Sequence, residues 1–228
     1  MIQISNGNAR TGLICSQMRL GTTWAVRAGI GAFLLLTGTT MASAEQTATE
    51  SVKRTIDAVI SILTSEELNQ PDRSIERRQK IEHVIRQRVD YEDMAKRALG
   101  WHWTELSDAE RQEFVGLFVQ LLRDTFAGRI DTYAGEQVRY LSEQHEENCA
   151  EVKTKLSGPK VNTLLDFRLV DQDGDWYVYD VVIDGAGIVS NYHAQFASII
   201  RDHSYAGLAT KMREKTLVVK AFETTMAR

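Results

Sequence analysis

The sequence predicts a single α+β domain in which a curved antiparallel sheet and its helices enclose an apolar space. Apolar residues recur at helical spacing through the first half of the chain, and they alternate at every second residue between about 136 and 184. Helical spacing then returns after 187. Helices, a meander of consecutive strands and helices again form an α+β pattern. We therefore expect one domain over 45–228, with a helical N-terminal half, a sheet over 136–184 and C-terminal helices.

The first 44 residues have the three-part pattern of a secretory signal peptide. Basic residues precede an apolar run from Ala28 to Leu36, and the segment ends in the small-x-small sequence Ala42-Ser43-Ala44. The apolar run is much shorter than the roughly 20 residues that a membrane span needs. We therefore expect cleavage after Ala44 and export of residues 45–228.

Four helices are expected in the first half of the domain, and each has a local signal. Residues 49–63 and 73–89 carry apolar stripes at helical spacing, separated by Asn69-Gln-Pro-Asp72. The short helix 91–99 ends at Gly100, a typical residue just beyond a helix C-terminus. The long helix 107–133 opens with the capping box Ser107-Asp-Ala-Glu110.

Four antiparallel strands are expected next, ending with 175–184, and helices should follow from about 187 and from about 205 to 217. The turns are Ser157-Gly-Pro-Lys160 and Asp171-Gln-Asp-Gly-Asp175. The last strand is apolar on both faces. Strict alternation puts Trp176, Val178 and Asp180 on one face, and the opposite face then carries Tyr177, Tyr179, Val181 and Ile183.

The residue pattern favours neither metal chemistry nor a known nucleophile. The five histidines are scattered without ligand spacing, and the acidic run from Asp171 has a tryptophan where a calcium loop needs glycine. The sequence has no G-x-S-x-G elbow and no phosphate-binding loop. With a net charge of −4 and no basic stripe, nucleic acid is not an expected partner. No cofactor is expected.

One carboxylate keeps an enzymatic alternative open. Asp180 lies among aromatic residues of the last strand, and a shielded carboxyl with a raised pKa can act as a general acid or base. Strand alternation points the neighbouring tyrosines away from it, so a capping role or a hydrogen bond to a loop is the favoured interpretation. The alternative is an NTF2-like enzyme acting on a small hydrophobic substrate with Asp180 as acid/base.

Three segments in the expected order resemble the MlaC family, also called the toluene-tolerance auxiliary family. They are Tyr91-Glu-Asp-Met-Ala-Lys-Arg-Ala-Leu-Gly100 with the capped helix after it, Leu121-Leu122 with Thr125-Phe126, and Trp176-Tyr-Val-Tyr-Asp-Val181 with Ile183-Asp-Gly185 and Asn191-Tyr192-x-x-Gln195-Phe196. The resemblance covers about 47–220. The family usually has Arg after the tyrosine of the last motif, where this chain has His193.

The resemblance implies a function without catalysis. It implies an NTF2-like architecture and a soluble periplasmic carrier of phospholipid in the Mla system. Such a carrier shuttles lipid between an outer-membrane lipoprotein–porin complex and an inner-membrane ABC transporter bearing an MCE-domain ring. That traffic maintains the lipid asymmetry of the outer membrane.

The physical chemistry of lipid tails sets what such a carrier needs. Two acyl chains hold roughly 30 methylenes, and exposing them to water costs on the order of 20 kcal/mol. We therefore expect a cavity toward or beyond the upper end of the usual range of roughly 300–1,000 Å³. The expected lining residues are Phe114, Phe118, Leu121, Leu165, Phe167, Trp176, Val178, Tyr192, Phe196 and Ile199.

Two alternatives to a lipid cavity stay open at the level of sequence. Apolar stripes alone favour an ordinary packed core over a cavity. A binding module without a ligand, docking on a membrane complex through the charged helix 73–89, would show no cavity at all.

Overall fold

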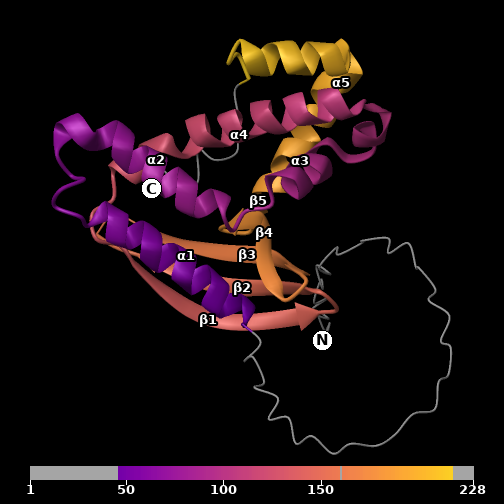
Figure 1. Cartoon of the computed structure of the whole chain (residues 1–228). Helices are drawn as coiled ribbons and strands as arrows, with labels where there is room; N and C mark the ends of the chain where they lie inside the picture. Colours follow the sequence, from indigo (N-terminus) through magenta and orange to yellow (C-terminus); the bar gives the residue numbers. More distant parts are fainter. Residues whose placement is uncertain (1–45, 160, 218–228) are drawn as a thin grey trace, which may run out of the picture.

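The computed structural model describes residues 46–159 and 161–217, which form helices and one antiparallel sheet (Figure 1). The predicted signal peptide, residues 1–44, lies outside the described residues. The helices are α1 (Ala48–Leu63), α2 (Ser74–Arg86), α3 (Tyr91–Leu99), α4 (Asp108–Asp131) and α5 (Ile188–Arg213), with short 3₁₀ turns at Pro71–Arg73 and Gly100–Glu105. The strands are β1 (Gln137–Glu146), β2 (Cys149–Ser157), β3 (Asn162–Gln172), β4 (Asp175–Ile183) and β5 (Ala186–Gly187). The α+β prediction is confirmed.

Side-chain caps set several helix starts. Thr47 and Glu50 form a capping box at α1, and Ser107 and Glu110 form the predicted one at α4. Helix α3 starts after Asp90, whose carboxylate accepts the backbone N–H of Asp93 at 2.9 Å. These local contacts satisfy backbone donors that the first turn of a helix leaves unpaired.

Helix α2 is shorter than predicted because the chain after it pairs with the sheet. The predicted helix reached residue 89, whereas α2 ends at Arg86. Val89 forms a parallel bridge with Val178 of β4. The N–H of Val178 donates to the carbonyl of Arg88 at 2.8 Å, and the N–H of Asp90 donates to the carbonyl of Val178 at 2.9 Å. Residues 88–90 are therefore fixed against β4.

The sheet is a meander in the order β1-β2-β3-β4-β5, with every neighbouring pair antiparallel. The sequence predicted about four strands, and β5 adds a fifth of two residues, in which Gly187 pairs with Val182. A side chain at Gly187 would place its Cβ 3.0 Å from a carboxylate oxygen of Asp180. This close approach explains the glycine at the point where strand becomes helix.

A β-bulge in β4 corrects the predicted faces of that strand. Leu169 pairs with Val178 and Arg168 pairs with Asp180, so Tyr179 is an extra residue. Beyond the bulge the alternation is inverted, and Val181 lies on the same side as Val178 instead of opposite to it. Asp180 correspondingly leaves the face that Trp176 and Val178 share, because one inserted residue exchanges the two faces.

The two predicted C-terminal helices are joined in α5. The backbone at Ser204 is not helical, with φ 63° and ψ 172°, and this residue separates the two helical stretches. The break lies one residue before the predicted start of the last helix at 205. It lets the last stretch turn back over α4, where the hydroxyl of Tyr205 donates to the carbonyl of Glu110 at 3.3 Å.

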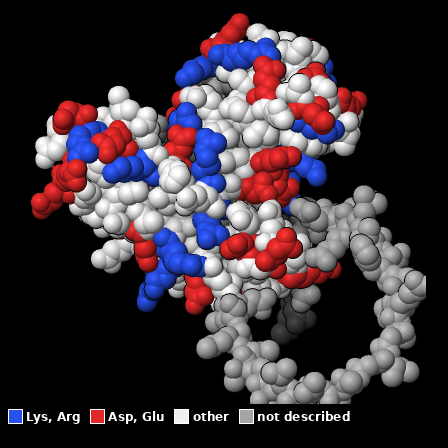
Figure 2. Space-filling view, in the orientation of Figure 1, with Lys and Arg blue, Asp and Glu red and all other residues white. Residues whose placement is uncertain are grey.

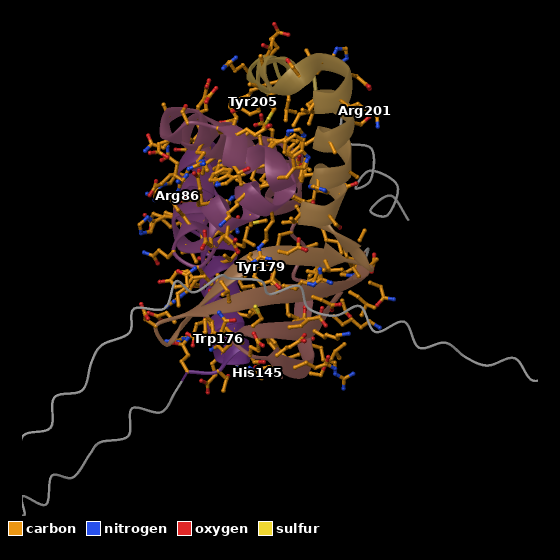
Figure 3. The ribbon with its side chains drawn as sticks, turned by 90° about the vertical axis from the view of Figure 1, so that its right-hand side faces the viewer. Arg86, His145, Trp176, Tyr179, Arg201 and Tyr205 are labelled. Carbon is orange, nitrogen blue, oxygen red and sulfur yellow. The ribbon has the colours of Figure 1, made fainter. Side chains whose placement is uncertain are left out.

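The apolar interior consists of two main clusters on either side of β4. One lies among α3, α4 and α5 and includes Phe114, Phe118, Tyr192 and Phe196. The other lies between α1 and the sheet. Figure 3 places Trp176 at the sheet end of the molecule and Tyr205 at the helical end. Lys and Arg are intermixed with Asp and Glu on the face shown in Figure 2.

Candidate functional site: an apolar cavity between α1 and the sheet

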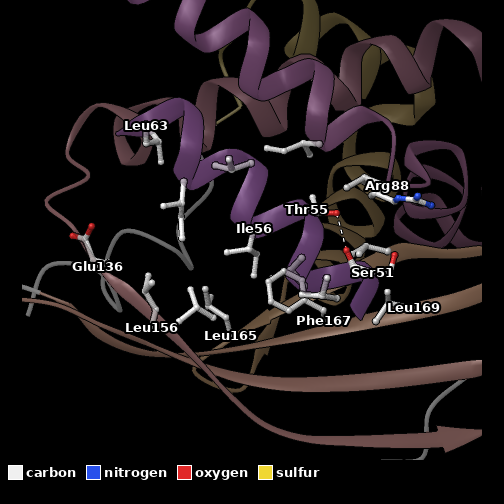
Figure 4. A pocket seen from close by; sticks show the side chains of 18 of the residues that line it. Ser51, Thr55, Ile56, Leu63, Arg88, Glu136, Leu156, Leu165, Phe167 and Leu169 are labelled. Carbon is white, nitrogen blue, oxygen red and sulfur yellow. Dashed lines mark hydrogen bonds between the residues drawn. The ribbon is translucent and has the colours of Figure 1, made fainter. Parts of the chain in front are cut away.

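A cavity of about 360 Å³ lies between α1 and one face of the sheet (Figure 4). Helix α1 supplies one wall along most of its length, and β1, β2, β3 and β4 supply the opposite wall. The end of α2, the segment after it and the segment before β1 complete the lining. The lining residues are Ser51, Val52, Thr55, Ile56, Val59, Ile60, Leu63, Ile85, Arg88, Val89, Tyr133, Glu136, Val138, Leu156, Leu165, Phe167, Leu169, Val178 and Val181.

Aliphatic side chains and one phenylalanine form most of this lining, and its hydroxyl groups are already hydrogen-bonded. The hydroxyl of Thr55 donates to the carbonyl of Ser51 at 2.9 Å, and the hydroxyl of Ser51 donates to the carbonyl of Trp176 at 3.3 Å. These alcohols therefore place no unpaired donor along the length of the cavity. Such a surface suits a hydrocarbon ligand, since a polar ligand would lose hydrogen bonds to water without replacement.

The charged groups of the described lining are one cation and one carboxylate at opposite ends of the cavity. Figure 4 places Arg88 beside Ser51 at one end and Glu136 beyond Leu63 at the other. The side chain of Arg88 is 29% exposed and contacts the carboxylate of Asp175 at 3.3 Å. Glu136 is buried, and its carboxylate accepts the backbone N–H of Ala134 at 2.8 Å.

The ten residues predicted to line a cavity are divided between the two clusters. Leu165, Phe167 and Val178 line the cavity. Trp176 belongs to the same cluster but lies beyond the lining, where its indole N–H donates to the carbonyl of Gln46 at 2.9 Å. The other six lie in or against the helical cluster: Phe114, Phe118, Leu121, Tyr192, Phe196 and Ile199. A role of any of the ten residues in lipid contact stays a prediction.

Four aromatic residues of the helical cluster fill their space by packing on one another. Phe114 meets Phe196 edge to face with ring centroids 5.7 Å apart, and Phe118 meets Tyr192 in the same way at 5.4 Å. All four rings, including that of Phe196, are fully buried. The hydroxyl of Tyr192 lies 3.1 Å from that of Thr125, which satisfies its polar end.

This division also explains the size of the cavity. The sequence led us to expect a volume near or above the upper end of the range for ligand pockets, whereas about 360 Å³ is near the lower end of roughly 300–1,000 Å³. The large aromatic side chains that were expected to surround one wide space fill a separate core. The presence of a cavity still contradicts the docking-module alternative, which predicted none.

Asp180 caps α5 and does not belong to the described cavity lining. Its side chain is buried, one carboxylate oxygen accepts the N–H of Val189 at 3.0 Å, and the other contacts Arg168 at 3.3 Å. Burial raises the pKa of Asp180 above its usual value, although the Val189 amide and the Arg168 guanidinium oppose this shift. The expectation of a capping role is confirmed.

Sequence reasoning missed most of the wall that α1 contributes. Apolar spacing predicts a helix with one apolar face, formed by Val52, Ile56, Val59, Ile60 and Leu63, but it does not predict that this face lines a cavity. The same spacing describes a packed helix and a helix over a hollow. The length of the stripe could have indicated this wall, because five large apolar residues along a helix need a partner surface of the same length.

His193, which stands where the family usually has Arg, packs against the end of α3. Its ring nitrogen Nδ1 lies 3.2 Å from the carbonyl oxygen of Ala98. A Cβ atom at Gly100 would lie 2.6 Å from the ring. The imidazole therefore fits a space that a glycine leaves open.

Residues 46–159 and 161–217 hold neither a cluster of metal ligands nor a membrane-spanning helix. Within these ranges, no three or more His, Cys, Asp or Glu side chains are grouped so that they could hold a metal ion. In the same ranges, every helix is too short or too polar to cross a membrane.

Comparison with known proteins gives consistent matches. The family model described as MlaC protein matches residues 53–214. A relative from Haemophilus influenzae, named intermembrane phospholipid transport system binding protein MlaC, is 23% identical over 132 residues, which are 55% of this chain and 62% of that protein. This chain thus matches less than two thirds of the relative's length.

A solved structure shares the fold. It is that of a phospholipid-binding protein from Ralstonia solanacearum in complex with a phospholipid, with a TM-score of 0.65 and 23% identity. The match covers 72% of this chain and 94% of that one.

Proposed function

Because the chain belongs to the MlaC family, we propose that it binds the acyl chains of a phospholipid in the cavity between α1 and the sheet. The observation that carries the proposal is the cavity itself. Protein interiors are normally packed without such space, and a hollow lined by aliphatic side chains favours an apolar guest. The name of the Haemophilus relative and the ligand of the Ralstonia structure support the choice of guest.

The wider role that we propose is that of a carrier without catalytic activity. The leader pattern of residues 1–44 supports export to the periplasm. A phospholipid crossing that aqueous space needs its tails shielded, since each buried methylene contributes about 0.8 kcal/mol. We further propose that the chain exchanges lipid with an outer-membrane lipoprotein–porin complex and an inner-membrane ABC transporter with an MCE-domain ring, and so maintains outer-membrane lipid asymmetry.

Two neighbouring leucines of β3 give a matched test of the cavity. Leu165 lines the cavity, whereas Leu164 is 46% exposed. Leu165→Trp places an indole in the space that we assign to lipid, and overpacking costs about 1–3 kcal/mol. We expect lipid affinity to fall about tenfold. Leu164→Trp adds the same ring outside the cavity and should leave affinity unchanged.

The measurement is displacement of a fluorescent acyl-chain probe from each purified variant, with circular dichroism to establish that both fold. Equal affinities in the two folded variants would show that lipid binds elsewhere. Loss of binding in both variants would also count against the cavity, because a substitution at the exposed Leu164 should not change lipid affinity.

A further inference from the structure

The two charged residues of the cavity lining suggest how a bound lipid is oriented. A phospholipid has an anionic phosphate at one end and hydrocarbon at the other. The described lining has its guanidinium, Arg88, at the end near the start of α1, and its carboxylate, Glu136, at the end near Leu63 (Figure 4). Building on the function proposed above, we propose that the phosphate lies beside Arg88 and that the tails run along α1 toward Glu136.

The position of Arg88 is fixed by the fold. Its carbonyl accepts the N–H of Val178, and the next residue, Val89, pairs with the same residue of β4. The backbone of Arg88 is therefore fixed beside the cavity end, while its side chain remains partly exposed. A headgroup at this end stays in contact with water, and only the tails need to enter the apolar space.

The present partner of Arg88 is weakly held. Asp175 is the first residue of β4, its side chain is 54% exposed, and its carboxylate is 3.3 Å from the guanidinium. Exposed ion pairs of this kind contribute little to stability. A phosphate can replace this carboxylate as the partner, because Arg binds both groups through the same planar donors.

The opposite end is unsuited to an anion. Glu136 is buried, and its carboxylate accepts the backbone N–H of Ala134, two residues away. A phosphate brought next to this carboxylate would place two negative charges together in a medium of low dielectric constant. Hydrocarbon tail ends have no such conflict, so the charges at both ends favour the same orientation.

The length of the cavity wall fits tails that lie parallel to α1. The lining residues of this helix extend from Ser51 to Leu63, a rise of about 18 Å at 1.5 Å per residue. Tails in one leaflet span half of a hydrocarbon core that is about 30 Å thick, or about 15 Å. A tail that starts near Ser51 therefore reaches the end of α1 without leaving the apolar wall.

The first test compares two ligands with identical acyl chains, phosphatidylglycerol and diacylglycerol, by displacement of a fluorescent acyl-chain probe. The wild-type protein should bind phosphatidylglycerol more tightly. Arg88→Gln should reduce this preference about tenfold, since a hydrogen bond between charged partners is lost. Asp175→Asn should increase the preference for phosphatidylglycerol, because it removes the ion pair that competes for Arg88. Arg201→Gln makes the same change at an exposed arginine outside the cavity lining and should leave the preference within about twofold.

The outcomes separate this inference from the proposed function. If the wild-type protein binds neither ligand, the proposed lipid function and the proposed orientation are both wrong. If it binds both ligands and the preference does not change in Arg88→Gln and Asp175→Asn, the lipid function stands and the orientation is wrong. Displacement of the probe by glycerol phosphate alone, at the concentration that the lipid needs, would mean that the site takes free phosphate and would also overturn the orientation.

A second measurement needs no substitution. Phosphatidylglycerol with a diazirine at the end of one tail is bound to the wild-type protein, irradiated, and its adducts are mapped by peptide mass spectrometry. We expect adducts on residues 59–63, 133–138 or 156, near Glu136. Adducts concentrated on Ser51, Val52 or Leu169, near the Arg88 end, would overturn the proposal.

Discussion

The contacts of Asp180 indicate a structural role and not a catalytic one. Both carboxylate oxygens are engaged, by Val189 at the start of α5 and by Arg168 of β3. Arg168 also contacts Glu151 of β2 at 3.4 Å, so three strands share one charge cluster. A general acid or base needs access to a substrate, whereas this carboxyl is 3% exposed and is absent from the described cavity lining.

The raised pKa of Asp180 gives a prediction with a definite sign. Burial raises the folded-state pKa, so the folded chain takes up this proton at a higher pH than the unfolded chain. The contribution of Asp180 to stability is therefore full below its unfolded-state pKa, near 3.9. It is lost as the pH rises through the folded-state value.

Asp180→Asn, which cannot ionise, removes this dependence. We expect the free energy of unfolding of the variant minus that of wild type to become more negative as the pH falls from 7 to 4. Urea denaturation at several pH values measures the difference, and a difference that does not vary with pH would contradict the assignment. The variant should also keep its lipid, whereas the enzymatic alternative requires loss of turnover.

The faces of β4 mark a limit of prediction at this scale. Alternation assigns Trp176 and Val178 to one face correctly, but the extra residue Tyr179 exchanges the faces beyond it. Nothing in the local sequence marks the bulge, because Tyr179 is an ordinary strand residue. The bulge is visible only in the pairing with Arg168 and Leu169 of the neighbouring strand.

At the scale of elements, local signals predicted the helices better than the sheet edges. The capping box at Ser107 and the glycine after α3 depend on residues within one turn, and the structure has both. The end of α2 and the strand β5 depend on pairing with distant residues of β4, such as Val178 and Val182. No pattern inside these segments specifies those partners.

Two glycines in the helical layer give a matched prediction of stability. Gly100 has φ 63° and ψ −137°, and a Cβ atom there would lie 2.6 Å from the ring of His193. Gly100→Ala should lower the free energy of unfolding by about 1–3 kcal/mol, since this backbone conformation favours glycine. Gly116, inside α4, has nothing within 4 Å of its added Cβ. Gly116→Ala should raise the free energy of unfolding by about 0.5–1 kcal/mol.

Urea denaturation of the two variants measures both effects in the same fold. If Gly100→Ala is as stable as wild type, Gly100 does not approach His193 as closely as described. Opposite signs in the two variants are the expected result.

At the scale of the whole molecule, the sequence predicted the class of fold and the presence of an apolar space, but not which residues border it. The predicted list joined two clusters that the structure separates, with Leu165 and Phe167 in the cavity and Phe114 and Phe196 in the helical core. Apolar periodicity identifies a buried face, yet it does not identify the surface that the face meets. That assignment depends on how α1 lies across the sheet (Figure 1).

The central claim is that the space between α1 and the sheet holds phospholipid. The most direct test is native mass spectrometry of the protein purified from a periplasmic extract, followed by organic extraction of whatever is bound. We predict a complex whose added mass is that of one two-tailed phospholipid at near-stoichiometric occupancy. A protein of bare mass, with no extractable lipid, would contradict the claim.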